Sequence, residues 1–106
     1  MPLKVRGETD DYLKAVMKVM AKYESQHPRA EIEGYRQNSV SIRIRIVDPD
    51  FTGVSRTDRH NTVWRVLDEL PEEIQSHLST ILLLTPDEKK KSFANSEFDD
   101  PIPSKL

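Results

Sequence analysis

The chain has 106 residues, the size of one ordinary domain, of which 36% are hydrophobic and 32% are charged. This balance favours a folded, soluble domain over a disordered or membrane-spanning chain. A net charge of −2 gives the chain no overall electrostatic attraction to nucleic acid or anionic membranes. The absence of cysteine excludes disulfides, thiolate metal ligands and a cysteine nucleophile within this chain, so any metal must use His, Asp or Glu.

Neither a signal peptide nor a membrane helix is expected. The N-terminal segment MPLKVRGETDD has no apolar core, and the longest apolar run covers only residues 81–84, far short of the roughly 20 residues that a membrane helix needs. We therefore expect a cytoplasmic protein without a membrane partner.

The first half of the chain predicts one helix and two strands. A helical spacing over about residues 10–25 is set by Leu13, Val16, Met17 and Met20. Pro28 prevents its continuation, and AEIEGYR is typical of a strand. Strict alternation in SVSIRIRIVD predicts a second strand, whose apolar face consists of Val40, Ile42, Ile44 and Ile46 and whose other face carries Arg43 and Arg45.

We expect these strands to form an antiparallel hairpin around a loop of residues 37–39. That loop places Ile32 opposite Ile44 and Glu33 opposite Arg43. An Arg-x-Arg strand resembles a phosphate-binding surface, but the glutamates across the hairpin would neutralise much of its charge.

The second half predicts two helices, a strand and a last helix. Thr57 is the expected N-cap of a helix ending near Leu70, and PEE begins a short helix that reaches about His77. STILLLT predicts a buried strand, and TPDE, with Thr three residues before Glu88, is a capping box. Residues 1–91 then form a single domain, and residues 92–106 are expected to be a loosely ordered tail.

This order predicts an α+β fold with a three-stranded mixed sheet. The first two strands are antiparallel, the third is parallel to the second, and helices pack on the sheet in a KH-like arrangement. A KH module binds RNA through a GXXG loop, and this chain has none. The turn between the two middle helices, DELPEEI, carries carboxylates that would repel phosphates.

Two motifs resemble those of the BolA family. The first is F-x-G-x-S-x-x-x-R-H, at Phe51, Gly53, Ser55, Arg59 and His60. The second is H-x-x-x-I-x-x-L-T-P-x-E, which runs from His77 to Glu88, and AEIE resembles the first strand of the family. The resemblance covers about residues 10–88.

This resemblance implies a non-enzymatic adaptor that binds a monothiol glutaredoxin and takes part in iron–sulfur cluster handling or redox regulation. A two-iron, two-sulfur cluster would bridge the two proteins, with His77 as the ligand from this chain. The family's second ligand, Cys or His, lies between the first two strands, but YRQNSV contains neither. Cluster bridging of the usual kind is therefore in question. We expect that this chain alone binds no cluster.

The candidate partner contacts are Arg59, His60, Trp64 and His77. Each also has a structural interpretation. Arg59 can pair with a nearby acid such as Asp58, and His60 can form a local bond near the start of its helix. Trp64 can pack at the core boundary, and His77 can bond the last carbonyls of its helix. His27 matches no motif position, so we expect it to be exposed. A monomer or a weak homodimer is expected.

Two other interpretations stay open. Some BolA-like proteins are described as stress-response transcription regulators, and a nucleic-acid contact would use Arg56, Arg59 and Arg65. His60 and His77 could instead form a two-histidine metal site if the middle helices pack closely. Catalysis is not expected, because no nucleophile, acid–base pair or metal triad is recognisable.

Overall fold

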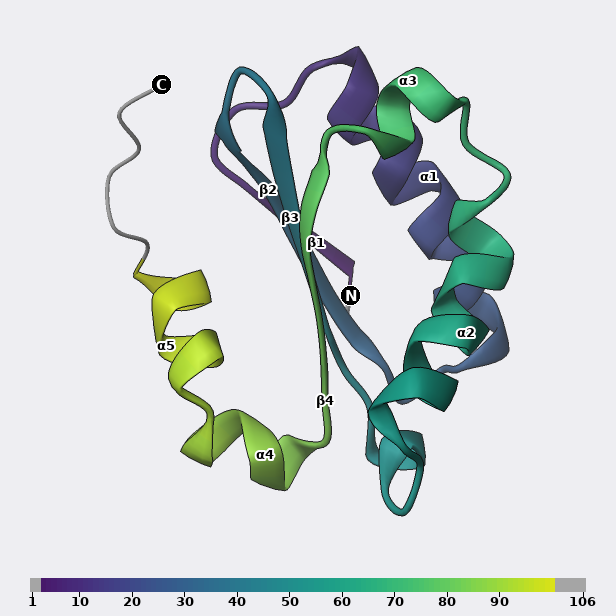
Figure 1. The fold of residues 1–106 in the computed structure, drawn as a ribbon, viewed down its shortest axis with the longest axis vertical. Helices are drawn as coiled ribbons and strands as arrows, with labels where there is room; N and C mark the ends of the chain where they lie inside the picture. Colours follow the sequence, from purple (N-terminus) through teal and green to yellow (C-terminus); the bar gives the residue numbers. More distant parts are fainter. Residues whose placement is uncertain (1–2, 101–106) are drawn as a thin grey trace.

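The computed structural model describes residues 3–100 as a four-stranded sheet with helices on both faces (Figure 1). The strand order is β1 (Leu3–Arg6), β2 (Glu31–Asn38), β3 (Ser41–Val47) and β4 (Leu78–Leu84). β2 and β3 form the predicted antiparallel hairpin, and β4 is parallel to β3 as predicted. The three-stranded sheet is wrong, because β1 adds a parallel edge strand beside β2.

Three helices cover one face of the sheet: α1 (Asp11–Gln26), α2 (Arg56–Leu67) and α3 (Glu72–Gln75) (Figure 1). α1 begins where predicted, with the side chain of Asp10 accepting a hydrogen bond from the Leu13 amide at 2.9 Å. α2 is capped by Ser55 instead of Thr57, and the Ser55 hydroxyl accepts from the Asp58 amide at 3.1 Å. The two hydroxyl residues lie two positions apart, so residue type alone could not choose between them.

The core lies between this face and the helices. Its fully buried side chains include Leu13, Val16, Met20, Ile32, Ile42, Ile44, Ile46, Val63 and Leu67. α1 approaches the sheet closely at Gly34, where an added Cβ would lie 2.7 Å from the sulfur of Met17. A side chain at Gly34 would therefore force the helix or Met17 to move.

The hairpin register differs from the predicted one by two residues. Ile32 pairs with Ile46 and Glu33 with Arg45, and the loop is a tight turn at Ser39 and Val40. Gln37 and Asn38, which were predicted to lie in the loop, belong to β2, with an irregularity in the pairing between Arg36 and Asn38. Val40 is consequently 50% exposed rather than part of the apolar face. A shift of two residues leaves every other side chain on its predicted face.

Two further helices, α4 (Pro86–Lys91) and α5 (Phe93–Asp99), lie on the other side of the sheet (Figure 1). The capping box is confirmed, since Thr85 and Glu88 each accept a hydrogen bond from the other's amide. Residues 92–106 were expected to form a loosely ordered tail, but residues 93–99 form α5, in which Phe98 is only 1% exposed. Residues 101–106 lie outside the described part of the chain. No helix among residues 3–100 combines the length and the apolar character needed to cross a membrane.

Candidate functional site

His77 lies between α3 and β4, at the amino end of the strand. Its amide donates to the carbonyl of Ile74 at 3.0 Å, and its carbonyl accepts from the amide of Ile42 at 2.6 Å. These backbone bonds fix the position of the residue. Its half-buried side chain lines an open hollow of the surface, which we call the His77 surface and which consists of Asp10, Asp11, Tyr12, Arg36 and His77.

The imidazole of His77 has two neighbours in this hollow. The ring of Tyr12 meets it edge-on, with 4.8 Å between ring centroids, and a terminal guanidinium nitrogen of Arg36 lies 3.2 Å from its Nδ1. Arginine can only donate, so Nδ1 must accept and the neutral ring carries its hydrogen on Nε2. A metal ion bound at Nε2 would require the opposite tautomer, in conflict with Arg36.

Arg36 is itself held from two sides. Its Nε contacts Oδ2 of Asp10 at 2.5 Å, and a terminal nitrogen donates to the carbonyl of Asn38 at 3.2 Å. The hydrogen bond from Leu13 and then that from Arg36 hold the pKa of the Asp10 carboxyl below its ordinary value. The start of α1 and the end of β2 thus place Arg36 against His77.

Tyr12 connects the ring of His77 to α3. A hydrogen bond with Glu73 is the largest cause that raises the pKa of the Tyr12 hydroxyl above its ordinary value. The phenol therefore stays neutral near neutral pH. The His77 surface combines a phenol ring, an imidazole, one guanidinium group and two carboxylates, which suits recognition of a polar protein surface.

The donor set does not fit an iron–sulfur cluster held in the usual family manner. The β2–β3 turn consists of Ser39 and Val40, and the chain has no cysteine. Among residues 3–100, His77 belongs to no group of three or more metal-ligating side chains. One imidazole is the only such ligand that this surface offers besides carboxylates.

Arg59 has a structural position. It is 5% exposed, and its guanidinium donates to both carboxylate oxygens of Glu88, at 2.6 and 3.2 Å. Further bonds reach the carbonyls of Phe51, Val54 and Leu83. The predicted pairing with Asp58 is wrong, because the side chain turns inward and joins the turn after β3 to β4 and α4. Such burial leaves little of Arg59 for a partner or a phosphate.

His60 and Trp64 both belong to α2. His60 is exposed, whereas Trp64 is half-buried and packs against the core, as its structural interpretation predicted. His60 follows Arg59, which bonds Leu83 near the carboxyl end of β4, while His77 precedes the amino end of that strand. β4 has 7 residues at about 3.3 Å each, so its two ends are roughly 20 Å apart and a His60–His77 metal site is not formed.

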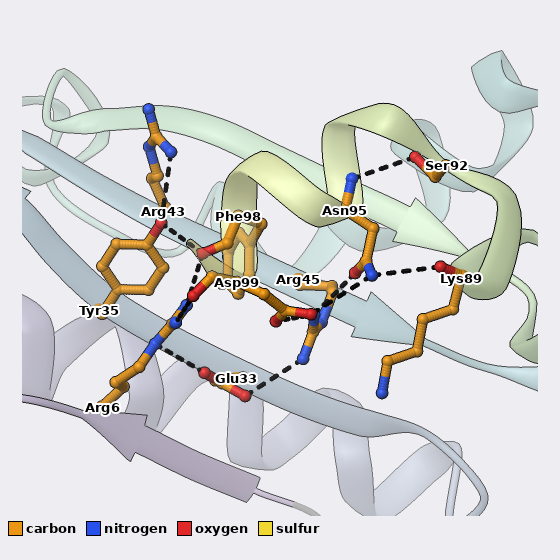
Figure 2. Close-up of polar contacts among 10 residues, drawn as sticks. All are labelled: Arg6, Glu33, Tyr35, Arg43, Arg45, Lys89, Ser92, Asn95, Phe98 and Asp99. Atoms are coloured by element: carbon orange, nitrogen blue, oxygen red, sulfur yellow. Dashed lines mark hydrogen bonds and ion pairs between the residues drawn. The ribbon is translucent and has the colours of Figure 1, made fainter. Parts of the chain in front are cut away.

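The Arg-x-Arg face of β3 is covered by α5, as Figure 2 shows. Arg45 bonds Asn95 at 2.7 Å, Asp99 at 2.6 Å and Glu33 at 3.2 Å, and Arg43 pairs with Glu97. A glutamate across the hairpin does pair with an arginine of this face, as predicted, but Glu33 pairs with Arg45 instead of Arg43. Most of the remaining neutralisation comes from α5, which the sequence did not reveal.

The side chain of Phe98 packs on the centre of this face. Its carbonyl accepts from the hydroxyl of Tyr35 at 2.9 Å, and the guanidinium groups of Arg6 and Arg45 lie 5.1 and 4.8 Å from its ring centroid (Figure 2). Because its guanidinium group lies against the ring of Phe98, Arg45 is not accessible to a phosphate. The exposed arginines of α2, Arg56 and Arg65, are nine residues apart and therefore point to opposite sides of the helix.

Comparisons with known proteins give one similarity. No protein-family model matches the chain, and no curated protein matches it. The chain is similar to the solved BolA domain of SufE1 from Arabidopsis thaliana, with 26% sequence identity and a TM-score of 0.46. The match covers 68% of this chain and 92% of that one.

Proposed function

We propose that the chain is a non-enzymatic, BolA-like adaptor that docks onto a monothiol glutaredoxin through the His77 surface. The observation that carries this proposal is the placement of His77 at its motif position, fixed by backbone bonds and open to solvent on one side. Its role in iron–sulfur handling or redox regulation follows from the resemblance of the motifs.

The residues support a form of this function in which the chain docks onto the glutaredoxin but supplies no ligand to the cluster. The tight β2–β3 turn supplies no second ligand, and Arg36 holds Nδ1 of His77 as an acceptor. The partner would therefore hold any cluster with its own ligands. His77, Tyr12 and Arg36 would provide the contact surface.

The proposal of a non-enzymatic role is supported by how the titratable groups of this surface are used. Asp10 caps α1 and pairs with Arg36, and Nδ1 of His77 accepts from Arg36. General acid–base catalysis needs a group free to exchange a proton with a substrate. Each of these groups already has a partner within the fold.

Nucleic-acid binding has weaker support. Of its three candidate arginines, Arg59 is buried against Glu88, and Arg56 and Arg65 face opposite sides of α2. A backbone of phosphates is best followed by cations on one continuous surface.

Isothermal titration calorimetry with a monothiol glutaredoxin that carries no cluster tests the docking. We expect His77→Ala and Tyr12→Ala each to weaken binding by about tenfold, a typical loss for a side chain at the centre of an interface. His60→Ala is the matched control, since it removes an exposed histidine near the other end of the sheet and should leave the affinity unchanged. Equal affinities for all four proteins, or a loss confined to His60→Ala, would contradict the proposed surface.

A further inference from the structure

Two loops at one end of the hairpin bring together three side chains that could share a cation. His27 follows the end of α1, and Asp48 and Asp50 follow the end of β3. The pairing of Glu31 with Val47 sets these two loops side by side. One ligand atom from each of the three side chains lies within 4.8 Å of the others, and Nδ1 of His27 is 3.8 Å from Oδ2 of Asp48.

Asp48 is a buried residue whose carboxylate is only partly satisfied by hydrogen bonds. Its side chain is 0% exposed, and its Oδ1 accepts from the amide of Asp50 at 2.9 Å as the N-cap of the turn Pro49–Phe51. Its Oδ2 is buried and has no hydrogen-bond partner in the described part of the chain. The capping role uses only Oδ1 of Asp48, and an asparagine at this position would accept the same hydrogen bond. A buried carboxylate oxygen without a partner is costly unless a cation or a donor faces it.

Tyr23 closes the inner side of this cluster. Its ring stacks on that of His27 with 4.2 Å between centroids, which fixes the orientation of the imidazole. Its hydroxyl is also buried and lacks a hydrogen-bond partner within residues 3–100. Burial, and then the charges of Asp48 and Asp50, raise the pKa of the Tyr23 hydroxyl, so the phenol remains neutral beside the two carboxylates.

We propose that His27, Asp48 and Asp50 bind a divalent transition-metal ion of the Zn²⁺ type. One imidazole nitrogen and two carboxylate oxygens suit Zn²⁺, whereas Ca²⁺ and Mg²⁺ prefer oxygen ligands alone. Tetrahedral ligands at about 2.0–2.2 Å from the metal lie roughly 3.3–3.6 Å apart, so ligand atoms that are now within 4.8 Å of one another would have to move closer by up to about 1.5 Å.

Asp50 gives the site its open side. It is exposed, and an ion pair with Arg29 occupies its Oδ1, leaving the other oxygen for the metal. Three protein ligands then leave a fourth position for water. The bound ion would tie the end of α1 to the connection between β3 and α2. This site lies at the opposite end of the 16-residue α1 from Tyr12, so it is independent of the His77 surface.

Calorimetric titration of the full chain with ZnCl₂ tests this site. We expect one Zn²⁺ per chain, with shifts in the ¹⁵N NMR spectrum confined to residues 23–30 and 48–52. Asp48→Asn, which keeps the N-cap, and His27→Gln should each weaken binding by about tenfold or more. His60→Ala and His77→Ala are matched controls that remove the other two histidines, and each should bind Zn²⁺ as the unmodified chain does.

Asp50→Asn keeps the test decisive if Asp48→Asn fails to fold. Asp50 is exposed, so its substitution should preserve the circular dichroism of the fold while still weakening Zn²⁺ binding. Absence of Zn²⁺ binding to the folded chain would overturn the proposal. So would binding that survives the His27 and Asp50 substitutions, or that is lost in either control.

Discussion

At the scale of single residues, Arg59 and Glu88 show how a motif position can be structural. The sequence marks Arg59 as part of a motif but does not identify its partner, because Glu88 lies 29 residues further along the chain. Only the parallel placement of β4 beside β3 brings the two together. A local search of the sequence therefore selects Asp58, the nearest acid, and is wrong.

The ion pair should affect acid unfolding. Arg59 first, and then the Thr85 amide, lower the pKa of the Glu88 carboxyl from 4.5 to about 2. A lowered pKa in the folded state adds stability that is fully present above the ordinary pKa and is lost as the pH falls through the folded value. Glu88→Gln should therefore reduce stability at neutral pH and flatten its decrease between about pH 4.5 and 2. Urea unfolding across this range measures both effects, and an unchanged slope would contradict the role of Glu88.

The tautomer of His77 is a second prediction at this scale. The neutral ring should carry its hydrogen on Nε2, because Arg36 donates to Nδ1. Long-range ¹H–¹⁵N NMR correlations distinguish the two ring nitrogens. Arg36→Ala should produce a mixture of tautomers, and an Nδ1–H form in the unmodified chain would show that Arg36 does not contact the ring as described.

At the scale of elements, hydrophobic patterns predicted the helices and strands that bury a continuous face. The alternation of apolar and polar residues in the two hairpin strands predicted which side chains point inward. It could not predict the register, because registers that differ by two residues bury the same face. β1 has only four residues at a half-exposed edge. α5 has a single buried aromatic residue, and its position depends on arginines from two strands, β1 and β3, which no local pattern reveals.

Phe98 should contribute strongly to stability and Phe93 should not. Both belong to α5, but Phe98 is 1% exposed and Phe93 is 87% exposed. Phe98→Ala should lower the free energy of unfolding by about 3–5 kcal/mol, whereas Phe93→Ala should change it by less than about 0.5 kcal/mol. Chemical denaturation of the two variants measures the difference. Similar losses in both would mean that α5 does not pack on the sheet through Phe98.

At the scale of the whole molecule, the two faces of the sheet are covered by different helices, and α5 covers the arginines of β3. The sequence predicted the α+β class and singled out His77 as a motif position, and it has neither Cys nor His in the turn that joins β2 to β3. The nucleic-acid alternative rested on Arg56, Arg59 and Arg65, and Arg59 pairs with Glu88 in the structure. The two arginines of β3 are also paired, because α5 supplies Glu97 to Arg43 and Asp99 to Arg45.

This arrangement predicts weak and non-specific interaction with DNA. At low salt the full chain should give little change in the fluorescence anisotropy of a labelled duplex, and Arg56→Ala and Arg65→Ala should not alter it. The net charge of −2 and the covered face of β3 are the physical reasons. Tight binding with a steep dependence on salt, reduced by either substitution, would favour the nucleic-acid function instead.

The most direct test of the central proposal is an NMR titration of the ¹⁵N-labelled chain with a cluster-bearing monothiol glutaredoxin. The shifts should centre on residues 10–12, Arg36 and His77. At saturation the visible circular dichroism of the cluster should be the same with the unmodified chain and with His77→Ala, because docking does not depend on a cluster ligand from this chain. Shifts centred on α2, or no shifts at all, would contradict docking through the His77 surface.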